Sequence, residues 1–176
     1  CGRQALMQGA KVVHVSLELE EEQVVPRYYQ ALFAAAETDE EYVHPELVIS
    51  KGKLIKTKET LTEPEISFRE PGGVRKLRNE MKKFGPRLGN LVVKSFPTAS
   101  LTVSALEGYL DYLEEVEEFI PQVCIIDYPK LMKLDSKDLR ISLGRTVEEL
   151  RGVAMSRNLA MVLPHQGTRA SMGARR

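Results

Sequence analysis

Four short runs of aliphatic residues stand out along the chain, separated by longer stretches with apolar residues at helical spacing. The runs are Lys11-Val12-Val13-His14-Val15, Leu91-Val92-Val93, Val123-Cys124-Ile125-Ile126-Asp127 and Leu159-Ala160-Met161-Val162-Leu163. Each run is unbroken rather than alternating, which is typical of strands that are covered on both faces in a parallel sheet. The pattern therefore predicts four strands of one mostly parallel sheet.

Helical periodicity fills the stretches 20–36, 102–119 and 137–157. Their predicted apolar stripes are, in order, Val24, Val25, Tyr28, Leu32 and Phe33; Val103, Leu106, Leu110, Leu113 and Val116; and Leu139, Leu143, Val147, Leu150 and Ala154. Ser100 or Thr102 is placed to cap the second helix. Strands alternating with helices predict an α/β domain with right-handed crossovers.

Residues 44–73 interrupt this alternation. Four lysines (Lys51, Lys53, Lys56 and Lys58) lie among Leu54, Ile55 and Thr57, ahead of the turn-forming Pro71-Gly72-Gly73. We expect a β-hairpin or loop insertion here. The lysines could face DNA, but Glu59, Glu63, Glu65 and Glu70 dilute the positive charge, so a solvated hairpin is the favoured interpretation.

Composition narrows the class of protein. The chain has 176 residues, 43% hydrophobic and 28% charged, which fits one globular domain. Lys plus Arg equal Asp plus Glu at 25 each, so any nucleic-acid contact must be local. The apolar runs are far shorter than the ~20 residues of a membrane-spanning helix. Two cysteines and three scattered histidines form neither a disulfide framework nor a zinc-ligand spacing, and we expect a reducing, cytoplasmic setting.

Polar residues follow the ends of three predicted strands. Asp127 ends one aliphatic run, Glu18 follows another, and His165 and Gln166 follow the last. Ligands of parallel sheets bind at the carboxyl ends of the strands, so these residues should share one site. A carboxylate at such a point can hold Mg²⁺, and a second can act as a general base. The structural alternatives are a turn or cap for Asp127 and a helix-start acid for Glu18.

The order and spacing of these residues resemble the RecA-like ATPase domain of DnaB-type hexameric replicative helicases. The parallels are Val15-Ser16-Leu17-Glu18-Leu19, Thr98-Ala99-Ser100-Leu101-Thr102, Ile125-Ile126-Asp127-Tyr128-Pro129-Lys130-Leu131-Met132, and Asn158-Leu159-Ala160 leading to His165-Gln166-Gly167-Thr168-Arg169. They run nearly from end to end of the chain. Pro129, Lys130 and His165 stand where these helicases usually carry Leu, Gln and Ser, which marks a divergent member.

The resemblance implies a function and a set of roles. Glu18 would be the water-activating carboxylate, Asp127 the Walker B magnesium ligand, and Gln166 with His165 the γ-phosphate sensor. The implied ligands are ATP and Mg²⁺, and the implied partners are single-stranded DNA and the other subunits of a homo-hexamer. Residues that could reach the DNA or a neighbouring subunit are Lys130, Arg169, Arg175 and Arg176.

One motif of such ATPases is absent from the sequence. No G-x-x-x-x-G-K-[ST] occurs, so the backbone cradle and lysine for the phosphates are lacking. Since the chain starts at Cys1 without a Met, we expect a partial RecA-like P-loop domain over 1–176, incomplete at both ends and inactive alone. The expected function is a fragment of an ATP-dependent DNA helicase. The alternatives are a RecA-like recombination or signalling ATPase, or a binding and assembly module without a P-loop.

Overall fold

The computed structural model describes residues 1–33, 35–36, 42–50, 53–62, 66–67, 70–134 and 138–165. Side chains are described for all of these except 36, 42–50 and 53–62. The chain divides into two compact units. Unit 1 comprises Cys1–Val25 and Pro86–Arg176, and unit 2 comprises Pro26–Gly85. Each unit is described below by itself.

Unit 1 is built on a four-stranded parallel sheet. Its strands are β1 (Val12–Ser16), β6 (Leu91–Ser95), β7 (Val123–Asp127) and β8 (Ala160–Val162), in the order β6-β1-β7-β8. β1 pairs with both β6 and β7, and β7 also pairs with β8, always in parallel. All four strands correspond to the predicted aliphatic runs, and the α/β fold with a mostly parallel sheet is confirmed.

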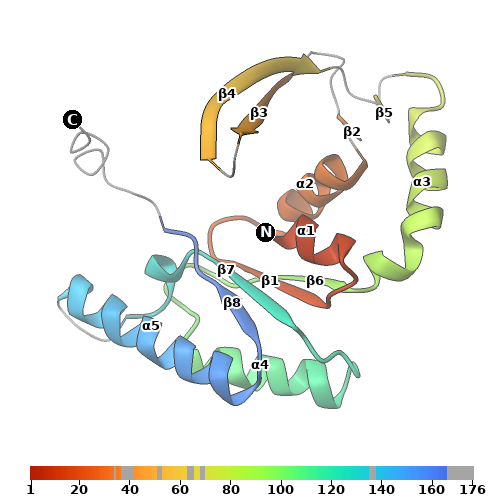
Figure 1. Cartoon of the computed structure of the whole chain (residues 1–176). Helices are drawn as coiled ribbons and strands as arrows, with labels where there is room; N and C mark the ends of the chain where they lie inside the picture. The colour runs from red at the N-terminus through yellow and green to blue at the C-terminus, as the bar shows by residue number, and fades with distance from the viewer. Residues whose placement is uncertain are drawn as a thin grey trace. The chain divides into compact units, whose positions relative to one another are not determined.

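Helices cover both faces of this sheet. The short α1 (Gly2–Met7) lies on one face, and α4 (Val103–Glu115) and α5 (Leu139–Ser156) lie on the other (Figure 1). A 3-10 turn, η1 (Pro129–Leu131), follows β7. Thr102 caps α4 by accepting a hydrogen bond from the Ala105 N–H, and Asp138 caps α5 by accepting from the N–H groups of Arg140 and Ile141. In both crossover helices, backbone N–H groups of the first turn therefore have a side-chain hydrogen-bond acceptor.

The main core of unit 1 lies between the sheet and the helices α4 and α5. Leu106, Leu110 and Leu113 of α4 are buried at helical spacing, and Leu150 and Val153 come from α5. On the strands, alternate residues such as Val13, Val15, Cys124 and Ile126 face this core. Burying aliphatic side chains of this size contributes about 1.5–3 kcal/mol each.

Two predicted stripes need correction. Val116, expected on the α4 stripe, is 64% exposed because α4 ends at Glu115. On α5 the predicted residues Leu139 and Val147 are exposed, at 47% and 40%. The buried stripe runs instead through Ser142, Thr146, Leu150 and Val153. The apolar pattern missed it because two small hydroxyl residues occupy the core-facing positions near the start of the helix.

Unit 2 contains the elements between Pro26 and Gly85. These are β2 (Ala35–Ala36) in parallel with β5 (Ile66–Ser67), and β3 (Tyr42–Ser50) in an antiparallel pair with β4 (Lys53–Thr62). The range 44–73, expected to hold a hairpin or loop insertion, includes most of this antiparallel pair. A small core joins Ala35, Ile66 and Leu77, with Phe33 and Met81 packed against it.

Two helices run across the division between the units. They are α2 (Glu21–Phe33) and α3 (Gly73–Leu88). Each carries a proline where the division falls, Pro26 in α2 and Pro86 in α3. α2 matches the predicted helix at 20–36, whereas α3 was not predicted. None of the described helices is both long and apolar enough to cross a membrane.

Candidate functional site

The register of the sheet brings three polar residues to one edge. Ser16, the last residue of β1, pairs with Ser95 of β6 on one side and with Asp127 of β7 on the other. The three carboxyl ends are therefore level with one another. The ladder continues one step beyond them, since the Leu17 N–H donates to the Asp127 carbonyl at 3.0 Å and the Phe96 N–H to the Ser16 carbonyl at 2.9 Å. This edge is where parallel sheets bind their ligands.

A closed turn follows β1 at this edge. The Ser16 hydroxyl donates to the Leu19 carbonyl at 2.6 Å and accepts from the Leu19 N–H at 3.0 Å. The Thr98 hydroxyl donates to the Leu17 carbonyl at 2.8 Å. These bonds fix the backbone on both sides of Glu18, whose side chain is exposed. Glu18 is thus held on an ordered turn directly behind the strand.

The start of α2 is bound to the end of β6. Ser95 donates twice, from its hydroxyl to the Glu20 carboxylate and from its N–H to the Glu21 carboxylate, both at 3.1 Å. Lys94 forms an ion pair with Glu21 at 3.2 Å. The Ser95 hydrogen bond and the Lys94 charge together hold the pKa of Glu21 below its ordinary value. Glu20 and Glu21 therefore have a structural role, because their carboxylates hold the start of α2 against the end of β6.

Asp127 lies half-buried at the end of β7, and the peptide bond that joins it to Tyr128 is cis. By the alternation of the strand, its side chain faces away from the core beneath α4 and α5. His14 of β1 lies close enough to be affected by the carboxylate. Burial lowers the pKa of His14, and the charge of Asp127 opposes that shift. The His14 imidazole and the Asp127 carboxylate therefore lie on the same face of the sheet near this edge.

The remaining predicted site residues fall on or beyond the described ends of the strands. Lys130 is exposed in η1, three residues after Asp127. His165 is exposed three residues after the end of β8, whose last residue, Val162, pairs with Ile125. The residues Gln166, Arg169, Arg175 and Arg176 lie outside the described part of the chain.

At this edge Asp127 suits a cation that takes most of its ligands from water and a bound substrate rather than from the protein. Within the described residues, no three His, Cys, Asp or Glu side chains gather as a metal site. Mg²⁺ commonly takes one or two protein carboxylates and completes its shell with water and substrate phosphates. Asp127 therefore fits Mg²⁺ bound together with a nucleotide, and does not fit a closed all-protein metal cage. Glu18, exposed on its turn, is accessible to a water molecule.

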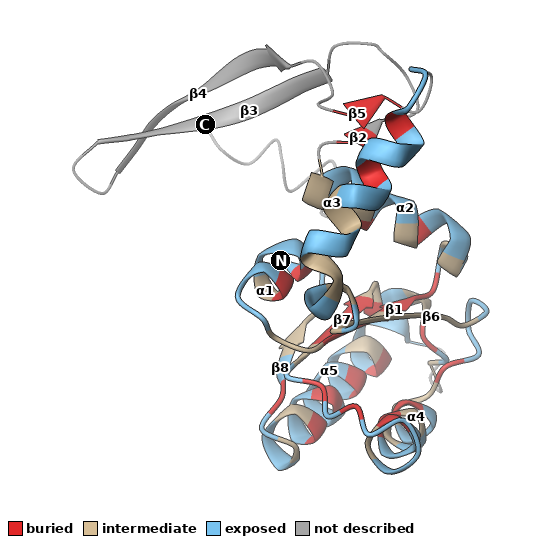
Figure 2. Ribbon diagram, turned by 90° about the vertical axis from the view of Figure 1, so that its right-hand side faces the viewer, coloured by how far each residue is buried: buried red, intermediate tan, exposed pale blue. Residues whose placement is uncertain are grey.

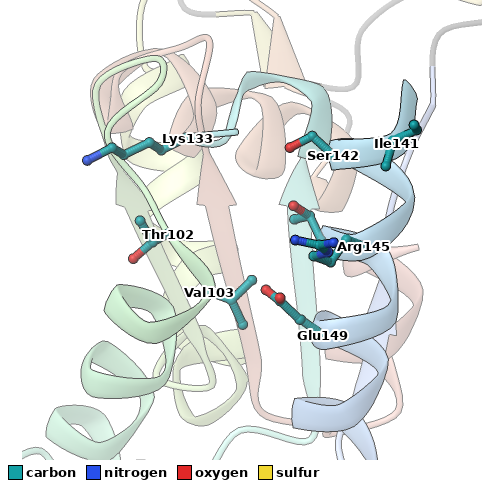
Figure 3. Close-up of a pocket in the computed structure, with 8 residues that line it drawn as sticks. Thr102, Val103, Lys133, Ile141, Ser142, Arg145 and Glu149 are labelled. Atoms are coloured by element: carbon teal, nitrogen blue, oxygen red, sulfur yellow. The ribbon is translucent and has the colours of Figure 1, made fainter. Parts of the chain in front are cut away.

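A pocket of about 210 Å³ opens elsewhere in unit 1, between the start of α4 and α5 (Figure 3). It is lined by Thr102, Val103, Lys133, Ile141, Ser142, Arg145, Thr146 and Glu149. In the close-up Arg145 and Glu149 extend from α5 toward the same space, while the Lys133 ammonium points away from α5. Because Arg145 is positively charged and Glu149 negatively charged, the pocket selects neither an anion nor a cation. Of the predicted site residues that the structure describes, none lines this pocket.

Sequence reasoning gave the carboxylates at this edge but missed the side chains that position them. Ser95 and Thr98 each form a hydrogen bond to residues more than seventy positions earlier in the chain. In the sequence Ser95 closely follows an aliphatic run and Thr98 opens the segment Thr98-Ala99-Ser100-Leu101-Thr102, but neither position signals a hydrogen bond. The hydrogen bonds themselves depend on the pairing of β1 with β6.

Comparison with known proteins adds evidence on the fold. No family model matches the chain, and no curated protein matches it. One matching solved structure is described as "The Structure Of A DnaB-Like Replicative Helicase And Its Interactions With Primase". Its TM-score to this chain is 0.60 and its sequence identity is 12%. The match covers 99% of this chain and 36% of that one, so the chain spans about a third of the helicase's length.

At 12% identity this likeness concerns the fold alone. It agrees with the parallel sheet and the crossover helices described above. The chain therefore has an α/β fold consistent with a RecA-like core, distantly similar to the fold of a DnaB-like helicase.

Proposed function

We propose that this chain is part of a RecA-like motor domain in which ATP hydrolysis drives movement along single-stranded DNA. The observation that carries the proposal is the register that brings Ser95, Ser16 and Asp127 level at one edge, with Glu18 on the turn behind Ser16. The likeness of fold to a replicative helicase supports it. The complete motor is proposed to be a homo-hexamer.

Each residue at the edge has a role in this proposal. Mg²⁺, when bound with ATP, supplies charge neutralisation at the phosphates. Asp127 supplies a carboxylate oxygen to the cation, and Glu18 accepts a proton from the attacking water. His165 and Gln166 donate hydrogen bonds toward the terminal phosphate. The residues proposed to contact DNA or a neighbouring subunit are Lys130, Arg169, Arg175 and Arg176.

Phosphate binding in this class needs a P-loop, which the 176 residues do not contain. The first test is therefore to read the coding sequence ahead of the Cys1 codon for a strand followed by G-x-x-x-x-G-K-[ST]. A protein that carries this motif together with the present chain should hydrolyse ATP, and faster with single-stranded DNA.

Substitutions in that protein test the two carboxylates. Glu18→Gln should lower kcat by about 100-fold or more while nucleotide binding persists, as expected for loss of a general base. Asp127→Asn should weaken Mg²⁺-dependent nucleotide binding. The matched control is Glu148→Gln, an exposed carboxylate on α5, which should change neither property. Unchanged hydrolysis in both edge variants would overturn the proposal.

A second candidate is a binding and assembly module that keeps the fold without the enzyme. A stop codon or unrelated sequence ahead of Cys1, together with no nucleotide binding, would support this module. ATP hydrolysis that DNA does not stimulate would instead support a RecA-like recombination or signalling ATPase.

A further inference from the structure

Helix α3 carries a concentration of positive charge that neither the net charge nor the helical periodicity predicts. Its sixteen residues, Gly73–Leu88, include one acid, Glu80. Its six cations, all exposed, are Arg75, Lys76, Arg78, Lys82, Lys83 and Arg87. Most of α3 is pale blue in Figure 2, which marks exposed residues. A locally basic surface therefore exists on a chain whose charges balance overall.

The opposite side of α3 is used inside unit 2. Leu77 is buried against Ala35 and Ile66, and Met81 packs against the same core. Phe84 meets Phe33 edge-on, with ring centroids 5.7 Å apart. Leu77, Met81 and Phe84 therefore already have partners within unit 2, whereas the cations of α3 are exposed.

Three of the cations form a row along the accessible side. Arg75, Arg78 and Lys82 are spaced i, i+3 and i+7, which places them on one face over a length of about 10 Å. Among the described residues, none forms an ion pair with these three. Lys76 and Lys83, on a different stripe, pair with Glu70 at 3.4 Å and with Glu80 at 2.6 Å. Three charges without an ion pair to any described residue thus lie within about one Debye length of one another.

The chemistry of the row favours a polyanion with regularly spaced phosphates. Two of its members are arginines, whose planar guanidinium matches a phosphate with two hydrogen bonds. A helix that binds a lipid surface inserts its apolar face, and in α3 that face is occupied by the core of unit 2. An acidic peptide would lack the phosphate geometry that arginine selects.

We infer that the row Arg75, Arg78 and Lys82 on α3 is a nucleic-acid contact surface that binds backbone phosphates without reading sequence. The proposed function also involves nucleic acid, but this surface uses other residues and needs no bound ATP. Contacts of this kind release counterions, so binding falls steeply with salt.

The test measures binding to a labelled oligothymidylate of thirty nucleotides by fluorescence anisotropy, without ATP, over a range of NaCl concentrations. The variant Arg75→Gln/Arg78→Gln/Lys82→Gln should bind about 10-fold or more weakly at low salt. Its slope of log affinity against log salt should be shallower by about 2, since each lost contact to a single strand accounts for about 0.7. The matched control is Arg3→Gln/Arg140→Gln/Arg151→Gln, three exposed cations of unit 1 with the same change in charge.

Every outcome decides the inference, provided that circular dichroism shows the variants to be folded. Selective loss in the α3 variant supports it. Equal loss in the control, unchanged binding in the α3 variant, or no binding by the starting protein overturns it. Competition by polyglutamate as strong as by DNA, or α3-dependent binding only to phosphatidylserine vesicles, also overturns it. Glu18→Gln and Asp127→Asn should leave this binding unchanged, so failure of the ATPase proposal would not affect the result.

Discussion

Arg157 ties the two helices that cover the sheet, and its removal should be measurable as a loss of stability. It follows the last residue of α5 and reaches α4, where one guanidinium nitrogen donates to the Glu114 carboxylate at 3.0 Å and the other to Asp111. Its side chain is only 18% exposed, against 32% for Glu114 and 53% for Asp111. We consider the substitution Arg157→Gln, which keeps part of the stem and removes the charge.

The exposures set the expected magnitude. A hydrogen bond between charged, partly buried groups contributes about 1.5–3 kcal/mol, and this value applies to Glu114. A solvent-exposed ion pair contributes about 0.2–1 kcal/mol, which applies to Asp111. Since glutamine can still donate one weaker hydrogen bond, the free energy of unfolding should fall by about 1.5–2 kcal/mol. For a chain of this length that corresponds to a Tm lower by about 3–8 °C.

Urea unfolding followed by far-UV circular dichroism measures this change. Arg151→Gln on the same helix is the matched control, because Arg151 is exposed and forms no ion pair with the described residues. It should change the free energy of unfolding by less than about 0.5 kcal/mol. In double-mutant cycles the coupling of Arg157 to Glu114 should exceed its coupling to Asp111. An Arg157→Gln variant as stable as the control would refute the reasoning.

Four further outcomes are expected. Leu110→Ala should lower the free energy of unfolding by about 2–5 kcal/mol, because Leu110 is fully buried; a loss below 1 kcal/mol in urea unfolding would contradict this. Thr146→Val should leave stability unchanged or raise it by up to about 1 kcal/mol, because Thr146 is buried as a residue, lines the pocket beside α4 and has no side-chain hydrogen bond to the described residues; a clear loss of Tm would contradict the assignment. Burial raises the pKa of Cys124 to about 12, so a native thiol assay with Ellman's reagent should count Cys1 alone, and both thiols only after unfolding. Burial also raises the pKa of Tyr109 to about 12; the unfolded chain then loses this proton first, so the stability contribution is complete below pH 10 and is lost as pH rises toward 12, and Tyr109→Phe should lack that loss in pH-dependent melts.

The sheet could be predicted from the sequence because its signal is local. Each strand is a run of aliphatic residues, and β1, β7 and β8 all formed where such runs predicted them. Helix α3 was not predicted, although Val74, Leu77, Met81, Phe84 and Leu88 stand at helical spacing among its cations. Reasoning from apolar spacing failed on α5, because Ser142 and Thr146 face the core while apolar neighbours are exposed.

The candidate site was likewise predictable where its signal is local, and not where it depends on residues distant in the sequence. Asp127 and Glu18 were identified from the sequence, since a carboxylate at the end of an aliphatic run is visible without a structure. The Thr98 hydrogen bond that supports the turn around Glu18 was not, because it reaches the Leu17 carbonyl, 81 residues earlier in the chain. Such a bond exists only after the sheet has formed, so no local pattern encodes it.

The position of β1 has a consequence for synthesis on the ribosome. Among the described strands β1 is made first, yet both strands that pair with it come much later, β6 about 80 residues on and β7 more than 100. At about 5–20 residues per second, β1 leaves the ribosome roughly 4–16 s before its first partner. During that interval β1 lacks both β6 and β7, and its two edges can pair with another nascent chain. β1 should therefore be a favoured target for chaperones that bind short aliphatic segments.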